Sequence, residues 1–393
     1  MAPAHAAALG FSPLDEELGL LSGSLTPHQH ESLVRLCVYM PFARACQMLR
    51  EITGVQVSEA TARRQTYVSG EAYEAVQTVQ AQPPKRTTAR ACRCQHCHKA
   101  AASGSKAQDP PAPKLAISSD GAYVPLVGGE WAEVKTLAIG EVELVETETG
   151  VKVQTNTISY FSRLTDAQTF GDLALVETQR RGVERATRVC AVQDGADWLQ
   201  AFVDLHRPDA LRILDFPHAA EYVNAIGQAA REAGTELPAT WLKDQLHRLK
   251  HQGPTALLAD LRALRAKHPE VEVIADKLAY VEKREAQMQY PMYQQQGWPI
   301  GSGMVESANK QVMQARLKGP GMHWARPHVN PMLALRTAEC NDRGPEAWLD
   351  LTAHRLHQRA QLRLERQKQR AAERQRTSRA TEPGVLPSLP DTF

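Results

Sequence analysis

The chain has 393 residues, of which 42% are hydrophobic, and its 46 basic and 44 acidic residues leave a formal net charge of +2. This length predicts two or three domains, and the nearly balanced charge does not by itself indicate a partner. No apolar run is long enough to span a membrane, and the N-terminus lacks the basic-then-apolar layout of a signal peptide. We therefore expect a cytoplasmic protein without a membrane partner. Seven cysteines, an odd total, argue against a disulfide framework in such a chain.

The first 81 residues are predicted to be helical. The segment 42–52 has apolar residues at helical spacing, a short break at Gly54 follows, and Ser58 can cap a second helix. This layout is typical of a helix-turn-helix. The second helix carries side chains that suit phosphates and base edges, namely Thr61, Arg63, Arg64 and Gln65. An ordinary helical hairpin with a polar outer face is the alternative.

Residues 82–113 are rich in Pro, Ala, Ser and Gly and are predicted to form a linker. The linker contains a cluster of candidate zinc ligands, Cys92, Cys94, Cys97 and His98. Thiolates and imidazoles at short spacing can bind zinc, and the metal could order a segment too polar to fold alone. The second half of a usual four-ligand site is missing. Exposed, reduced thiols without a role are therefore the alternative.

From residue 114 the pattern changes to strands. Three segments, 114–121, 132–142 and 155–161, predict an antiparallel meander. A helix, a fourth strand at 188–195, a short helix, a fifth strand at 210–215 and another helix follow. This order predicts an α/β fold with a mixed sheet and crossovers, and it is the strand order of an RNase H-like domain. In that topology the first and fourth strands are parallel neighbours.

Three of these strands end in an aspartate: Asp120, Asp194 and Asp215. Each alone is typical of a turn, most clearly the two that precede glycine. Together they favour a site, because reacting groups in sheets with crossovers gather at strand ends. Close carboxylates repel unless a divalent cation neutralises them. Oxygen ligands suit Mg²⁺ or Mn²⁺, which can activate water and stabilise an in-line attack at phosphorus.

Residues 219–296 are helical by pattern, and a glycine-rich loop follows them. The loop opens into a predicted unbroken helix, with Ser302 as its candidate cap and Glu306 in its first turn. Helical spacing places Glu306 on an outward face with Asn309, Lys310 and Met313. Glu306 could merely complement the positive end of the helix. If the helix packs on the sheet, Glu306 completes the acid cluster.

Basic residues recur after this helix. The segment 353–381 holds nine Lys and Arg residues against two Glu, a pattern that suits nucleic-acid backbones but is also typical of a solvated tail. We expect phosphate contacts from this tail and from Asn309, Lys310, Arg316, Lys318 and Arg326.

The segments 119–122, 194–198, 214–218 and 301–307 resemble, in their joint order, bacterial insertion-sequence transposases of the Asp-Asp-Glu type. The resemblance is to the Mutator-related, ISKra-type group and covers most of the chain. It implies a catalytic triad of Asp120, Asp194 and Glu306 that binds two metal ions. Asp215 and His218 match an accessory Asp-x-x-His pattern. Asp215 is the alternative second acid; Asp194 is preferred because the fourth strand neighbours the first.

The resemblance implies the following organisation: a helix-turn-helix region (1–81), the linker (82–113), the first part of an RNase H-like core (114–218), an all-helical insertion (219–296), the last part of the core with Glu306 (297–345), and a basic helical or disordered tail (346–393). The expected function is DNA cleavage and strand transfer by a homodimer or larger assembly, with Mg²⁺ or Mn²⁺ as cofactor and with terminal inverted repeats and target DNA as partners. Two alternatives stay open: an inactive, transposase-derived DNA-binding protein, and an RNase H-like nuclease without strand transfer.

Overall fold

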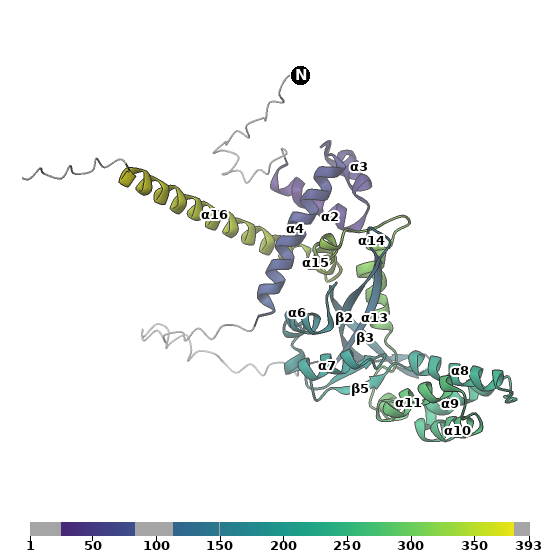
Figure 1. Cartoon of the computed structure of the whole chain (residues 1–393). Helices are drawn as coiled ribbons and strands as arrows, with labels where there is room; N and C mark the ends of the chain where they lie inside the picture. Colours follow the sequence, from purple (N-terminus) through teal and green to yellow (C-terminus); the bar gives the residue numbers. More distant parts are fainter. Residues whose placement is uncertain (1–24, 83–112, 149, 381–393) are drawn as a thin grey trace, which may run out of the picture.

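A five-stranded mixed sheet lies at the centre of the protein (Figure 1). The computed structural model describes residues 25–82, 113–148 and 150–380, and the strand order is β3-β2-β1-β4-β5. The strands are β1 (Leu115–Pro125), β2 (Trp131–Thr147), β3 (Gly150–Arg163), β4 (Val189–Gln193) and β5 (Leu211–Leu214). The first three form an antiparallel meander, β4 pairs parallel to β1, and β5 pairs parallel to β4. The predicted parallel pairing of the first and fourth strands is confirmed.

Different helices cover the two faces of the sheet, because alternate residues of a strand point to opposite faces. On one face, Leu115 and Ile117 belong to a core with Phe170 of α6 (Ala167–Arg180) and Phe202 of α7 (Asp197–His206). On the other face, Ala116 joins the core of the helices that follow β5. These are α8 (Phe216–Glu232), α9 (Trp241–Gln252), α10 (Pro254–Lys267), α11 (Glu272–Lys283) and α12 (Tyr290–Gln295). Two short helices lie elsewhere in the order: η1 (Val183–Arg185) between α6 and β4, and η2 (Glu285–Gln287) between α11 and α12.

The N-terminal helices pack against the C-terminal part of the chain. They are α2 (Pro27–Tyr39), α3 (Phe42–Thr53) and α4 (Glu59–Gln80), and they share one core with α15 (Val329–Cys340) and the start of α16 (Gly344–Ala380). Gly54 ends α3 in the left-handed conformation, and Ser58 caps α4 by accepting from the Thr61 amide at 3.2 Å. The predicted order of helix, glycine turn and serine-capped helix is therefore present. α16 extends away from the rest of the molecule (Figure 1).

The segment after the glycine-rich loop is not one regular α-helix, which corrects the predicted unbroken helix. α13 (Gly303–Ala308) continues into a π-helical stretch, η3 (Asn309–Gln314), and then into α14 (Ala315–Leu317). The wider turn shifts the periodicity, so Asn309 and Met313 are buried although α-helical spacing placed them outward with Glu306. π-helical turns within helices often occur at functional sites.

A buried guanidinium connects three of these elements. The Arg336 side chain, on α15, donates from Nε to the Val312 carbonyl at 3.1 Å, from Nη1 to the Val38 carbonyl at 3.2 Å, and from Nη2 to the Gln311 carbonyl. Arg336 is only 4% exposed. It therefore donates to main-chain carbonyls at the end of α2 and in the π-helical stretch. Because the site is buried, water cannot take the place of Arg336 as the donor.

Two further predictions concern the linker and the basic tail. The candidate zinc ligands Cys92, Cys94, Cys97 and His98 lie outside the described residues. The basic tail is helical through Ala380, and every side chain from Leu356 to Arg374 is exposed. Among the described helices, none has the length and apolar character needed to cross a membrane.

Two buried histidines should make the protein less stable in mild acid. Burial lowers the pKa of His30 and of His206 from 6.5 to about 4. The unfolded chain therefore takes up protons on both rings below about pH 6.5 while the folded protein does not, so stability falls as pH decreases from 6.5 to 4. Each ring accounts for at most about 3 kcal/mol over this range.

The measurement is urea unfolding at several pH values between 7 and 4.5. The His206→Leu variant should show a shallower pH dependence, because the leucine cannot titrate. An unchanged dependence in this variant would show that His206 does not titrate as argued.

Candidate active site

Asp120 lies in β1 with its carboxyl half-buried and held at both oxygens. Oδ1 accepts a hydrogen bond from the Gly121 amide at 2.7 Å, and Oδ2 accepts one from Asn309 Nδ2 at 2.8 Å. Burial is the largest influence and raises the pKa of Asp120, whereas the Gly121 bond acts in the opposite direction. The charges of Asp194 and Glu306 raise this pKa further. The three acids are therefore close enough to act on one another electrostatically.

Glu133 is a fourth acid beside Asp120, and its charge also raises the pKa of Asp120. It lies on β2, which pairs with β1, and its Oε2 accepts from Lys135 Nζ at 2.5 Å. A Cβ at Gly121 would be 2.2 Å from Glu133 Oε1, so a larger residue there would displace the Glu133 carboxylate. Sequence reasoning missed Glu133, because the strand pattern alone fixed no register between β1 and β2, and the observed register pairs Glu133 with Tyr123 rather than with Asp120.

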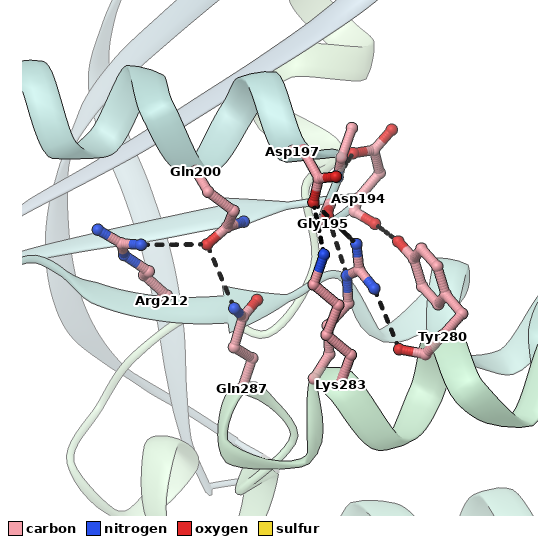
Figure 2. A network of polar contacts seen from close by, with 10 residues as sticks. Asp194, Gly195, Asp197, Gln200, Arg212, Tyr280, Lys283 and Gln287 are labelled. Atoms are coloured by element: carbon pink, nitrogen blue, oxygen red, sulfur yellow. Dashed lines mark hydrogen bonds and ion pairs between the residues drawn. The ribbon is translucent and has the colours of Figure 1, made fainter.

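Asp194 follows β4 directly, and its loop is held by the end of α11. Its Oδ1 accepts from the Ala196 amide at 2.8 Å, and its carbonyl accepts from Tyr280 Oη (Figure 2). The next carbonyl, of Gly195, accepts from Arg284 Nε at 2.9 Å. Gly195 has φ +83°, and a Cβ there would be 2.4 Å from Arg284 Nε. Glycine is therefore required where the loop passes against Arg284.

Two further contacts connect the same segments. Lys283 Nζ is 2.9 Å from Asp197 Oδ1, and Gln287 donates to Gln200 Oε1 at 3.2 Å (Figure 2). Both partners lie on α7, which begins immediately after the Asp194 loop. The helices that follow β5 therefore hold both the Asp194 loop and α7. No sequence motif marked Tyr280 or Arg284, because both act only through contacts between segments far apart in the chain.

Glu306 is exposed on α13, and Asp215 fixes the loop that precedes it. Asp215 is 5% exposed; its Oδ1 accepts from the Ser302 amide at 2.6 Å, and its Oδ2 accepts from the His218 amide at 3.0 Å. Ser302 stands at the predicted N-cap position, but its side chain makes no capping hydrogen bond. Both oxygens of Asp215 are thus occupied by main-chain amides.

His218 lies in the first turn of α8, partly exposed. Its Nδ1 is 3.7 Å from Glu221 Oε2. Its ring is 5.1 Å from the ring of Tyr222 and 6.1 Å from that of Tyr280, the residue that holds the Asp194 carbonyl. The His218 ring therefore lies near the side chain that holds the Asp194 loop.

The donor chemistry around Asp120 suits a divalent cation of the magnesium type. Carboxylates supply hard oxygen ligands, and Asn309, which is 4% exposed, has a side-chain oxygen without a hydrogen-bond partner among the described residues. Within the described ranges, however, no three His, Cys, Asp or Glu side chains lie close enough together to hold a metal ion. The charges of the other acids therefore influence Asp120, but the acids do not form a closed set of metal ligands.

The predicted DNA contacts divide into exposed and buried side chains. Five of the cations are exposed: Arg63, Arg64, Lys310, Lys318 and Arg326. Three predicted contacts, Gln65, Asn309 and Arg316, are buried at 7%, 4% and 2% exposure. We therefore correct these three to internal roles, since a buried side chain cannot reach a base edge or a phosphate on the surface.

Two of the other predicted contacts on α4 have internal partners: Thr61, which is partly exposed, and Arg63, which is exposed. Thr61 Oγ1 accepts from Ser58 Oγ at 2.9 Å, and Arg63 Nη2 is 2.6 Å from Glu59 Oε1. Arg63 and Glu59 are each about half exposed, with side-chain values of 52% and 47%. A surface ion pair of this kind contributes little to stability, so Arg63 can exchange its partner for a phosphate.

No protein-family model matches the chain, and no curated protein matches it.

Proposed function

We propose that the protein is a transposase that cleaves DNA at the ends of an insertion sequence and joins those ends to target DNA. The observation that carries the proposal is the electrostatic contact of Asp120 with Asp194 and Glu306, which come from β1, the β4 loop and α13. The β3-β2-β1-β4-β5 order of the mixed sheet supports an RNase H-like core. Such an order lets acids that are far apart in the chain approach one another at the sheet.

Asp120, Asp194 and Glu306 do not form a closed ligand set in this structure, and their carboxylates would have to approach one another to hold Mg²⁺ or Mn²⁺. When bound, such an ion lowers the pKa of water and offsets negative charge at a phosphate. Asn309 orients the Asp120 carboxylate through the 2.8 Å hydrogen bond to Oδ2. Tyr280 fixes the main chain at Asp194. The raised pKa of Asp120 means that cation binding should weaken as pH falls, since protons compete for the carboxylate.

The exposed cations supply the DNA contacts. Arg63 and Arg64 lie on α4, and Lys310 follows Glu306 by about one turn. Side chains of this type contact phosphates and fix the register of a duplex. The exposed basic residues of α16 extend this surface beyond the sheet. Because two DNA ends must be joined, we expect a dimer or larger assembly.

The test uses duplexes copied from the genomic DNA that flanks this reading frame, with a supercoiled plasmid as target and Mg²⁺ as the ion. We expect cleavage at an inverted repeat and joining of the freed 3′ end to the plasmid, with both products lost in EDTA. Cleavage without joining would instead assign a nuclease. DNA binding with no cleavage in either Mg²⁺ or Mn²⁺ would assign a DNA-binding protein without catalysis.

A further inference from the structure

A row of exposed apolar side chains runs along α16. Leu349 is 72% exposed, Leu356 is 59% exposed and Leu364 is 52% exposed. Ala353 and Ala360 lie between them and are also exposed. The spacing of three or four residues places all five on one side of the helix. We call this row the leucine stripe. Apolar side chains that form a contiguous exposed patch, unlike scattered ones, mark an interaction site.

The base of α16 packs on the rest of the protein through other side chains. Ala347 is 3% exposed and Leu351 is 1% exposed, and both belong to the core that α16 shares with α2, α4 and α15. Trp348 meets the His30 ring of α2 edge to face, with centroids 5.0 Å apart. Beyond this contact α16 extends away from the sheet (Figure 1). The described elements therefore leave the leucine stripe uncovered.

Positive charges accompany the stripe. Helical spacing places Arg359, Arg363 and Arg370 along one side of it. Burial is the largest influence on Arg355 and lowers its pKa, and the charge of Arg359 lowers this pKa further. Like charges thus lie close together on α16, and carboxylates beside them would offset the repulsion. A segment that covers this surface should therefore combine apolar side chains with acids.

The sequence just before α2 has this composition. Residues 11–21 read Phe-Ser-Pro-Leu-Asp-Glu-Glu-Leu-Gly-Leu-Leu, and we call them the acidic segment. Asp15, Glu16 and Glu17 stand between Leu14 and Leu18, and residues 1–24 contain no Lys or Arg. The acidic segment lies outside the described residues. Its charge is opposite to that of α16, and its leucines match the apolar character of the stripe.

The acidic segment joins the described part of the chain at the base of α16. Leu25 is 3% exposed and belongs to the same core as Ala347 and Leu351. From Leu351 to Leu364, α16 rises by about 20 Å. An extended chain from Leu25 back to Leu18 spans up to about 23 Å. The acidic segment is therefore long enough to follow the stripe to its end without any change in the described fold.

We infer that the acidic segment docks on the leucine stripe of its own chain and places its carboxylates beside the arginines of α16. Attachment at Leu25 raises the local concentration of the segment to the order of millimolar. A second α16 helix on the same stripe would instead bring like charges together. The docked segment covers cations that we proposed as DNA contacts, so it should compete with DNA. This competition rests on the proposed function, whereas the docking does not.

The first experiment locates the segment by photo-cross-linking in the full chain. The apolar cross-linker p-benzoylphenylalanine replaces either Leu356, on the stripe, or Glu365, which is exposed on the opposite side of α16. We expect the Leu356 position to cross-link to residues 11–21 in a product of monomer mass, and the Glu365 position not to do so. Mass spectrometry of the linked peptides identifies the partner.

Three outcomes of this experiment would overturn the docking. A product of twice the monomer mass would show that a second copy covers the stripe. Equal cross-linking from the Glu365 position would show that the contact is not specific to one side of α16. The absence of a cross-link to residues 11–21 from the Leu356 position would show that the segment does not dock there.

The second experiment tests competition with DNA through fluorescence anisotropy of a random-sequence duplex. The double variant Leu18→Ser/Leu21→Ser leaves the charge of the chain unchanged but should release the acidic segment. If about nine chains in ten are docked, DNA affinity should rise about tenfold, because the apparent affinity scales with the competent fraction. The Leu356 cross-link to residues 11–21 should be lost in the same variant.

Ile52→Ser is the matched control, because Ile52 is 69% exposed on α3, away from both the acidic segment and α16. It should change neither the cross-link nor the affinity for DNA. A double variant that loses the cross-link but binds DNA no more tightly would overturn the competition. Neither experiment measures cleavage, so a protein without strand-transfer activity would give the same results.

Discussion

Replacing Asp120 by asparagine should reduce DNA cleavage and strand transfer by at least about 1,000-fold, or ~4 kcal/mol in the activation free energy. The amide keeps the size of the carboxylate and can still accept from the Gly121 amide. It loses the negative charge that couples Asp120 to Asp194 and Glu306. The measurement is the initial rate of cleavage in Mg²⁺, with circular dichroism to confirm that the variant is folded.

Asp209→Asn is the matched control, because Asp209 is exposed and pairs only with Arg207 at 2.6 Å. It should retain the full rate. A folded Asp120→Asn protein with more than a tenth of the normal rate would contradict the proposed role of this acid.

The same assay distinguishes the two candidates for the second acid. Asp194→Asn should lose activity as Asp120→Asn does. Asp215→Asn should mainly lower stability, because an amide nitrogen cannot accept from the His218 or Ser302 amide. An Asp215→Asn protein that is fully stable yet inactive would make Asp215 the second acid.

Replacing Arg336 by methionine should lower the free energy of unfolding by about 3 kcal/mol or more. The methionine fills similar volume but donates nothing to the carbonyls of Val38, Gln311 and Val312, which then stay buried without a donor. The measurement is equilibrium unfolding in urea. Two of these carbonyls lie in the π-helical stretch, so the loss should also loosen the segment that carries Asn309.

Arg366→Met is the control for Arg336→Met. Arg366 is exposed on α16, so its replacement should change the stability by less than about 0.5 kcal/mol. If the two variants proved equally stable, the hydrogen bonds of Arg336 would have to be replaced by water, contrary to its burial.

The strands could be predicted because their information is local. The prediction that Asp120 ends its strand is wrong, however, because β1 continues through Asp120 to Pro125. Apolar runs that end in Asp marked β1, β4 and β5, and the order of elements predicted that β1 and β4 are parallel neighbours. The strands of the meander proved longer than predicted, since β2 reaches Thr147. Their exposed ends alternate too weakly to be recognised in the sequence.

The surroundings of the acids could not be predicted, because they arise from contacts between distant segments. An α-helical period placed Asn309 outward, whereas the π-helical turn directs it onto Asp120, 189 residues away. Arg316 looked like a phosphate contact from its charge alone. Its burial against Phe42 and Trp324 depends on how α3 meets the end of the chain, and no local pattern contains that information.

The hydrogen bond from Asn309 to Asp120 has a consequence for biosynthesis. A ribosome that has just completed β1 must still add almost half of the chain before the amide partner of Asp120 exists. The loop before Glu306 likewise cannot be fixed until the Ser302 amide exists to donate to Asp215. The N-terminal helices also lack their packing partners until α15 and α16 have been synthesised. Translation therefore delays the assembly of the three acids until the polypeptide is nearly finished.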